Sequence, residues 1–280
     1  MDMLLPLGPG LIVGLILGLT GAGGSIFAVP LLMWVMGWTL PQAVPVALLA
    51  VAVSATFGTL QAWPTGQVRY RAAMVIAFSG LLTAPLGLFA AEWLPVALLS
   101  VLFSAVILLA AVRLLLRTYQ TPSSSTQALT ADSRPNEVPA PHEPLCQVRP
   151  ETGRLRWTRP CTLAMTASGL STGFLSGLLG VGGGFIIVPA IQAVSNLSFH
   201  AATATSLMAI ALTSAWTVLM ALLAGKTLPW LVALPFIAAT LAGMLVGRRL
   251  APRLSGKRLQ TTFALLMMAV SFGMLSHALF

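Results

Sequence analysis

The chain has 280 residues, of which 57% are hydrophobic and only 8% are charged. Since a soluble domain carries about a quarter charged residues, this composition excludes a soluble globular protein and indicates an all-α polytopic membrane protein. The net charge of +9 lies largely beside apolar segments, which favours a role in membrane orientation over a nucleic-acid partner. The N-terminus has neither a basic region nor an obvious cleavage site, so no removed signal peptide is expected.

The first apolar segment carries a glycine-rich motif, GLTGAGGSIFAVPLL from Gly18, which recurs as GLLGVGGGFIIVPAI from Gly177. Glycine is costly in a helix interior, so each cluster indicates backbone that is not simply helical. Such backbone is tolerated at membrane depth only where protein encloses it or where it lines a cavity. The motif therefore predicts the working centre of a transporter.

The segments around the first motif are short. Ser25–Trp38 would form a helix of about 21 Å, less than the ~30 Å hydrocarbon core, and prolines and glycines interrupt the start of Leu4–Leu19. Two short arms around a glycine break predict a re-entrant hairpin. Six other segments have nearly the length that a bilayer requires: Pro41–Trp63, Ala72–Ala91, Pro95–Leu116, His200–Ala224, Pro229–Arg248 and Leu259–Phe280.

The likeness between the two parts of the chain extends beyond the glycines. When the two copies of the motif are aligned, residues 40–43 correspond to 199–202, and the Gly66 turn corresponds to the Gly225 turn. We therefore predict two homologous halves, residues 1–117 and 161–280, each with a glycine-broken hairpin and three transmembrane helices. In conventional counting this gives eight helical segments. Weak internal symmetry of this kind is typical of secondary transporters.

Residues 118–160 join the halves. They are rich in Pro, Ser and Thr and hold four of the six acidic residues, which predicts a hydrophilic, flexible linker. Cys146 and Cys161 form no CxxC pair and no metal-ligand spacing. We interpret them as two incidental thiols, with neither a disulfide framework nor a zinc site.

The positive charges distinguish two topologies. If each glycine segment crosses once, the halves run parallel and the cations of residues 248–258 lie opposite the others. If each segment is a hairpin, the halves are inverted and fourteen of the fifteen cations lie on one side, leaving only Lys226. The positive-inside rule favours the inverted arrangement, with the linker in the cytoplasm.

The predicted site combines helix N-termini with hydroxyl groups. Helix N-termini carry unpaired donors and partial positive charge, so they attract anions, and glycines let a ligand approach the backbone. We expect the two hairpin tips to meet near the bilayer midplane. The predicted substrate-binding residues are Gly21, Gly23, Gly24, Ser25, Gly180, Gly182, Gly183, Gly184, Thr203, Thr205, Ser206 and Ser54. Catalytic residues, metals and cofactors are not expected.

Structural explanations compete with this site. Serine and threonine can hold helices together or bond the carbonyl four residues earlier, and the glycines can serve close helix packing. A membrane hydrolase with Ser25 as nucleophile would need a general base, and the sequence places neither His200 nor His277 in an obvious pair with it. All six acidic residues lie outside the predicted spans, which disfavours proton or metal-ion transport.

The chain resembles the sulfite exporter TauE/SafE family of bacterial anion permeases. The resemblance is carried by GAGGSIFAVPLL with residues 41–43, and by GVGGGFIIVPAI with residues 200–206. The first copy departs from the family's pattern at Ser25 and at residues 44–47, so its half of the site is expected to be less polar. The resemblance implies a multi-pass transporter of the bacterial inner membrane.

The expected substrate is a small anion such as sulfite, thiosulfate or a sulfonate like sulfoacetate. We expect electrogenic facilitated transport or alternating access, with the lipid bilayer as the other partner. The alternatives are a membrane scaffold or assembly factor without transport, and a permease for a non-sulfur organic anion. The specific anion, the direction of flux, the coupling ion and the oligomeric state stay open.

Overall fold

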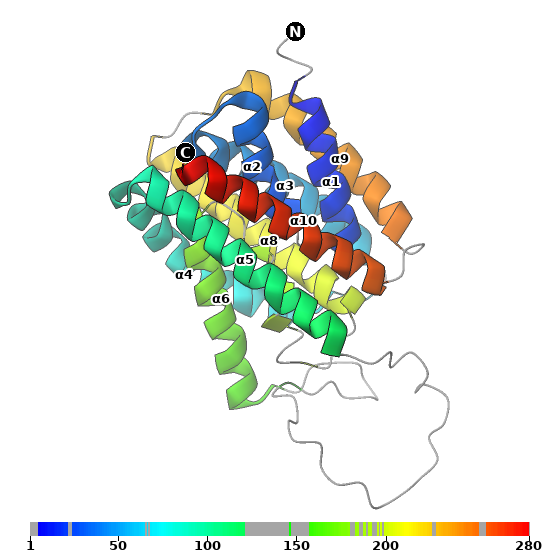
Figure 1. The fold of residues 1–280 in the computed structure, drawn as a ribbon. Helices are drawn as coiled ribbons and strands as arrows, with labels where there is room; N and C mark the ends of the chain where they lie inside the picture. Colours follow the sequence, from blue (N-terminus) through cyan, green and yellow to red (C-terminus); the bar gives the residue numbers. More distant parts are fainter. Residues whose placement is uncertain are drawn as a thin grey trace, which may run out of the picture.

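The computed structural model describes residues 5–21, 24–64, 66, 68–120, 146, 157–179, 183–184, 187–188, 190–191, 195, 197, 199–225, 228–251 and 256–279. Within these residues the chain folds into nine helices packed as a bundle (Figure 1). The helices are α1 (Leu7–Thr20), α2 (Gly24–Met36), α3 (Leu40–Ala62), α4 (Tyr70–Trp93), α5 (Val96–Gln120), α6 (Arg159–Leu179), α8 (Phe199–Leu223), α9 (Trp230–Leu250) and α10 (Gly256–Leu279).

Helix lengths agree with most of the predicted spans. In the described part of the chain, six helices are long and apolar enough to cross a membrane, namely α3, α4, α5, α6, α8 and α9. Five of these coincide with predicted spans, and α10 coincides with the sixth. Helices α1 and α2 have 14 and 13 residues, or about 20 Å each. Helix α6 has 21 residues, which the short arms of the first motif did not predict.

Helix α3 lies at the centre of the bundle. Its most apolar stretch is 72% buried, more than that of any other candidate span, and it packs on α2, α8 and α9. Large apolar side chains such as Leu82, Phe89 and Leu231 are exposed on outer helices, as a lipid-facing surface requires. The site must therefore be sought around α3.

Glycines at every fourth position of α1 allow it to pack closely on α9. A Cβ atom at Gly14 would overlap the carbonyl of Thr240, and one at Gly18 would overlap the carbonyl of Met244. Small residues at this spacing let two helix backbones approach each other in a membrane. Because successive glycines meet successive residues of α9, the two helices run in the same direction.

The same arrangement occurs between α6 and α4, at the equivalent glycines of the second repeat. A Cβ atom at Gly173 would overlap the carbonyl of Gly80, and one at Gly177 would overlap that of Ala84. These helices also run in the same direction. We call the two contacts the first seam (α1 with α9) and the second seam (α4 with α6).

Most of the other helix contacts also occur in pairs that correspond between the two predicted halves. Helix α4 packs on α8 as α9 packs on α3, while α3 with α8 and α5 with α10 are pairs of equivalent helices. These pairs and the two seams are therefore unchanged when each helix is exchanged with its counterpart in the other predicted half. The contact of α6 with α8 is an exception, since α1 and α3 make no contact of similar extent. Each seam joins a helix from one predicted half to a helix from the other.

Two hydrogen bonds establish helix directions. The guanidinium of Arg248, near the end of α9, donates to the carbonyl of Gly58, near the end of α3. The backbone N–H of Arg69, just before α4, donates to the Thr205 hydroxyl near the start of α8, at 3.1 Å. Helix α9 therefore ends where α4 begins, so these two equivalent helices run in opposite directions.

Helices α1 and α2 form a hairpin. A Cβ atom at Gly24 would lie 2.6 Å from the Leu17 nitrogen, so α2 begins beside the last turns of α1. At the other end of α2, the ring of Trp34 lies against Gly273, near the end of α10. Since α10 begins where α9 ends, α2 returns toward the end of the bundle from which α1 starts.

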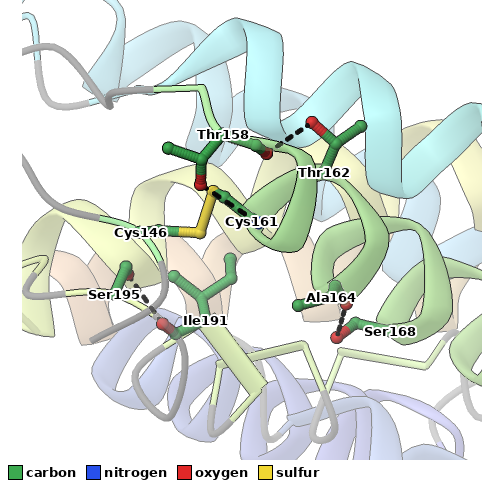
Figure 2. Close-up of a disulfide and its surroundings, with 8 residues drawn as sticks. All are labelled: Cys146, Thr158, Cys161, Thr162, Ala164, Ser168, Ile191 and Ser195. Atoms are coloured by element: carbon green, nitrogen blue, oxygen red, sulfur yellow. Dashed lines mark hydrogen bonds between the residues drawn. A yellow bond between two sulfur atoms is a disulfide. The ribbon is translucent and has the colours of Figure 1, made fainter. Parts of the chain in front are cut away.

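A disulfide and a backbone bridge at Cys146 bring the start of α6 close to Ser195. Cys146 and Cys161 are bonded, with their Cα atoms 5.1 Å apart, and both are fully buried. Cys146 also pairs with Ser195 in a parallel bridge, so residues 161 and 195 lie close together (Figure 2). The prediction of two incidental thiols is wrong, because a separation of 15 residues says nothing about a contact that the fold creates.

Candidate functional site

The turn after α1 requires a glycine. Gly21 has φ of 72° and its N–H donates to the Leu17 carbonyl at 2.7 Å. This left-handed conformation disfavours other residues. A Cβ atom there would also overlap the methyl group of Thr203 on α8. The first motif and Thr203, both predicted as site residues, are therefore in contact across the two halves.

Helix α2 begins directly after this turn, as predicted for a helix starting near Ser25. Gly24 is its first residue, and no acidic residue occupies its first turn. The free N–H groups of this turn can donate to an anion. Gly23 and the Ser25 side chain lie outside the described residues.

The second motif contains a similar turn. Gly183 has φ of 64° and packs on Thr172 of α6, whose carbonyl would lie 2.8 Å from an added Cβ atom. Its carbonyl accepts a hydrogen bond from the Ile187 N–H at 3.3 Å, and Gly184 beside it is buried. Gly180 and Gly182 lie outside the described residues.

The two seams end at different levels of the bundle. Gly18 packs at the level of Arg248, near the end of α9, whereas Gly177 packs at the level of Leu88, near the end of α4. Since α4 and α9 run in opposite directions, the two seams end toward opposite ends of the bundle, whereas Gly183 itself lies back at the level of Thr172, in the middle of α6. The meeting of the two hairpin tips near the midplane stays a prediction.

Several buried hydroxyl groups have no hydrogen-bond partner within the described structure. Ser54, Ser176 and Ser214 are fully buried, and their Oγ atoms, like Oγ1 of the half-buried Thr203, are unpartnered. Buried polar atoms nearly always have a hydrogen-bond partner, so each exception requires an explanation, and a functional role is one of them. These four residues, which we call the unpartnered hydroxyls, are the best candidates for substrate contact.

The unpartnered hydroxyls lie at different levels of the bundle. Thr203 lies beside the Gly21 turn, and Ser54 lies one turn of α3 before Gly58, which packs on Met244 of α9. Ser214 follows Thr213, whose methyl group meets Gly80 in the middle of α4. Ser176 precedes Gly177, near the end of α4. Two of these four, Ser54 and Thr203, were predicted from sequence.

The other predicted hydroxyls make internal hydrogen bonds. Thr205 donates to the Ala201 carbonyl at 2.7 Å and accepts the Arg69 N–H. Ser206 donates to the Thr203 carbonyl at 2.8 Å. Both therefore follow the structural explanation, in which Ser and Thr bond the preceding turn.

The described charges are unevenly distributed. Glu92, exposed in the last turn of α4, is the one acidic residue among the described positions. Arg69, Arg71 and Arg159 precede or begin α4 and α6, and Arg248 and Arg249 end α9, at the opposite end of the bundle from Glu92. Arg248 is half-buried and reaches Gly58, beside α8. It places one positive charge near the Gly21 turn.

The sequence comparisons agree with this architecture. The chain matches the family described as "Sulfite exporter TauE/SafE" over residues 7–274. The chain belongs to this family. It is also similar to two proteins named "Probable membrane transporter protein" from Xylella fastidiosa. The relative from strain 9a5c is 32% identical over 275 residues, which cover 96% of this chain and 94% of the relative.

The relative from strain Temecula1 / ATCC 700964 is 30% identical over 274 residues, with 96% and 94% covered. No solved structure matches the chain significantly. The predicted family is confirmed, and the transporter is a multi-pass membrane protein whose relatives are named as transporters rather than enzymes.

Sequence reasoning missed part of this site. It selected glycines by their clustering, whereas the GxxxGxxxG spacing of residues 10–18 and 169–177 would have indicated the seams. Ser176 and Ser214 could not be distinguished from other helix serines, because a missing partner is visible only in the folded structure. Arg248 looked like an ordinary residue at a span end.

Proposed function

We propose that this transporter moves small anions, and that these are sulfur-containing oxyanions or organosulfonates such as sulfite, thiosulfate and sulfoacetate. The observation that carries the proposal is the set of unpartnered hydroxyls around α3 and α8. Neutral donors can replace part of the water around an anion. An acidic residue would repel it, and none of the described residues inside the bundle is acidic.

The proposed machinery consists of two inverted repeats, each with a re-entrant hairpin. The opposite directions of α4 and α9 and the exchangeable set of packed pairs support the inverted arrangement. The hairpin of α1 and α2 supports re-entry, since both short helices return to one end. Inverted repeats permit alternating access around a central site.

Transport is proposed to be electrogenic. A membrane potential acts on each moving charge with about 2.3 kcal/mol per 100 mV, and the described site contains no acidic partner that would carry a compensating proton. In proteoliposomes, an imposed potential should therefore change the rate of sulfite flux. A rate that is insensitive to the potential would refute this part of the proposal.

We propose that the arginine-rich end faces the cytoplasm of a bacterial cell and that the protein lies in the inner membrane. The disulfide joins residues at this same end, although stable disulfides are rare in the cytoplasm. Labelling of single cysteines introduced at residues 71 and 92 in intact cells tests the orientation. Access from outside at residue 92 and not at residue 71 is expected, and the reverse would overturn it.

The central experiment measures flux of sulfite, thiosulfate and sulfoacetate into liposomes containing Ser54→Ala and Ser214→Ala variants. A hydrogen bond to a charged ligand contributes about 1.5–3 kcal/mol, so each variant should lose roughly tenfold or more in flux at low substrate concentration. Folding should be unaffected, since no protein partner is lost.

The matched control is Ser104→Ala. Ser104 is equally buried but its hydroxyl donates to the Ser100 carbonyl at 2.9 Å. This variant should lose about 1 kcal/mol of stability and keep its flux. Equal flux in all three variants would remove the unpartnered hydroxyls from the mechanism.

The remaining alternatives are tested in the same liposomes. A scaffold or assembly factor would give no flux of any anion. A permease for non-sulfur organic anions would transport acetate or similar carboxylates and reject the sulfur anions, with the same dependence on Ser54 and Ser214.

A further inference from the structure

A cavity lies away from the unpartnered hydroxyls, at the arginine-rich end of the bundle. It has a volume of about 330 Å³ and is lined by the turn between α3 and α4 and by Trp157, which precedes α6. This volume falls at the lower end of the range for small-molecule sites, about 300–1,000 Å³. The cavity joins segments from the two halves that are far apart in the sequence.

The walls of this cavity combine positive charge with aromatic rings. Arg69 and Arg71 contribute the charge, and Trp63, Tyr70 and Trp157 contribute the rings. Nε of Arg69 is buried and unpartnered in the described structure. Glu92, the acidic residue of the described chain, lies at the far end of the 24-residue helix α4, about 35 Å away. The described protein thus supplies no carboxylate to neutralise these arginines.

The cavity lies at the N-terminus of α4, which also favours the binding of anions. Its lining includes Tyr70, Arg71 and Ala72, the first three residues of α4. The N-terminus of a helix has partial positive charge and unpaired N–H groups. A guanidinium binds the oxygens of sulfonate or phosphate with paired hydrogen bonds, and aromatic rings suit a small apolar group beside them.

The cavity also connects to the transport machinery. The N–H of Arg69 donates to Thr205 on α8, and Thr203, two residues earlier, contacts the Gly21 turn. An anion held by Arg69 would therefore lie beside the helix that carries two of the unpartnered hydroxyls.

We propose that this cavity is a second binding site, which holds an oxyanion group such as a sulfonate or phosphate that carries a small organic substituent. Because the cavity lies at the arginine-rich end of the bundle, we regard it as a vestibule for the transported anion, an interpretation that rests on the proposed transport function. The same chemistry would also accept the phosphate headgroup of an anionic lipid, and the experiment separates these two sources.

The experiment measures binding by calorimetry with the full chain in lipid nanodiscs. One arm titrates methanesulfonate into nanodiscs of neutral phosphatidylcholine, and the other compares this titration in nanodiscs containing phosphatidylglycerol. The test variant is Arg69→Gln/Arg71→Gln. The control is Arg113→Gln/Arg249→Gln, which removes the same charge from exposed positions at the same end but outside the cavity.

The test variant should weaken methanesulfonate binding about tenfold or more, as expected for loss of charge-assisted hydrogen bonds, while the control changes it less than about twofold. If methanesulfonate competes with the lipid headgroup, the wild type binds it more weakly in phosphatidylglycerol than in phosphatidylcholine. If the test variant then shows no such difference between the two lipids, the cavity is assigned to the lipid headgroup. Equal binding by wild type and test variant in both lipids would overturn the proposal. If the double variant does not fold, the single variants Arg71→Gln and Trp157→Leu replace it, and each should weaken methanesulfonate binding.

Flux separates this inference from the proposed function. A vestibule predicts that the test variant raises KM for the transported anion and leaves kcat unchanged. Binding at the cavity without any flux would refute the transport proposal and leave the site intact. Normal flux with no binding at the cavity would refute the second site and leave the transport proposal intact.

Discussion

The two seams show that packing was duplicated in this molecule, whereas the chemistry at their ends was not. In both, glycines at the same spacing let one helix lie directly on a partner from the other predicted half. At the end of the first seam stands Arg248, which reaches Gly58. The equivalent position in the second seam is Leu88. A symmetric framework therefore carries an asymmetric distribution of charge.

The difference has a physical basis. Backbone contact at Gly14 or Gly173 depends on the absence of any side chain, so both copies face the same steric restriction. A charged group near a membrane faces different surroundings at the two ends of the bundle, since positive residues are favoured on one side. In the inverted arrangement that we propose, the two repeats would therefore keep the same packing residues and acquire different charges.

The largest expected effect comes from breaking a seam. Gly14→Ala and Gly173→Ala each place a methyl group on a backbone carbonyl that cannot move away, and should cost about 3 kcal/mol or more. The two variants should be equally unstable in thermal melts monitored by size-exclusion chromatography.

The control for the seams is Gly8→Ala in the same helix as Gly14. An added Cβ atom at Gly8 meets nothing within 4 Å, and alanine favours helix. This variant should be as stable as the wild type or slightly more stable. If only one seam variant were unstable, the two seams would not be equivalent.

Removal of the disulfide should have the next largest effect. The Cys146→Ser/Cys161→Ser variant loses a cross-link over 15 residues, which contributes about 3 kcal/mol in the chain-entropy model. The position equivalent to Cys161 in the first half is Asp2, so this restraint occurs in the second half only. Hydrogen exchange should therefore increase at the start of α6 and stay unchanged in α1. An equal increase in both would contradict the local role.

A smaller effect on stability is expected at the turn of the first motif. Gly21→Ala requires a left-handed conformation, at about 1–2 kcal/mol, and also overlaps the Thr203 methyl group. Gly37→Ala has the same backbone requirement, with φ of 65°, but no neighbour within 4 Å. Gly21→Ala should therefore be less stable than Gly37→Ala in thermal melts, and should also lose flux.

A second substitution checks the cause. Thr203→Ser keeps the hydroxyl and removes the methyl group. When it is combined with Gly21→Ala it should restore part of the lost stability, and when it is combined with Gly37→Ala it should restore none. No rescue at Gly21 would show that the contact with α8 does not determine the effect.

The smallest change in stability is expected for Arg248→Gln. This variant loses one hydrogen bond from a half-buried side chain to the Gly58 carbonyl, so the free energy of unfolding should change by about 1 kcal/mol. The loss of charge beside the Gly21 turn should raise KM for the transported anion. The neighbouring exposed Arg249→Gln should leave KM unchanged, and an equal rise in both would indicate only a general effect of net charge.

The sequence by itself determined much of this protein. Composition and segment length identified a polytopic helical membrane protein, because apolar runs of about 20 residues have few other uses. The doubled glycine motif indicated the internal repeat and resembled the family that the comparisons confirmed. The glycine clusters predicted backbone that is not simply helical, and Gly21 and Gly183 have positive φ there, a conformation that few other residues adopt.

Only the tertiary structure decided which of these residues meet. It placed Thr203 against Gly21, left the hydroxyls of Ser54 and Ser214 without partners, and joined Cys146 to Cys161. Such contacts depend on the approach of segments that are distant in the chain, which local patterns do not encode.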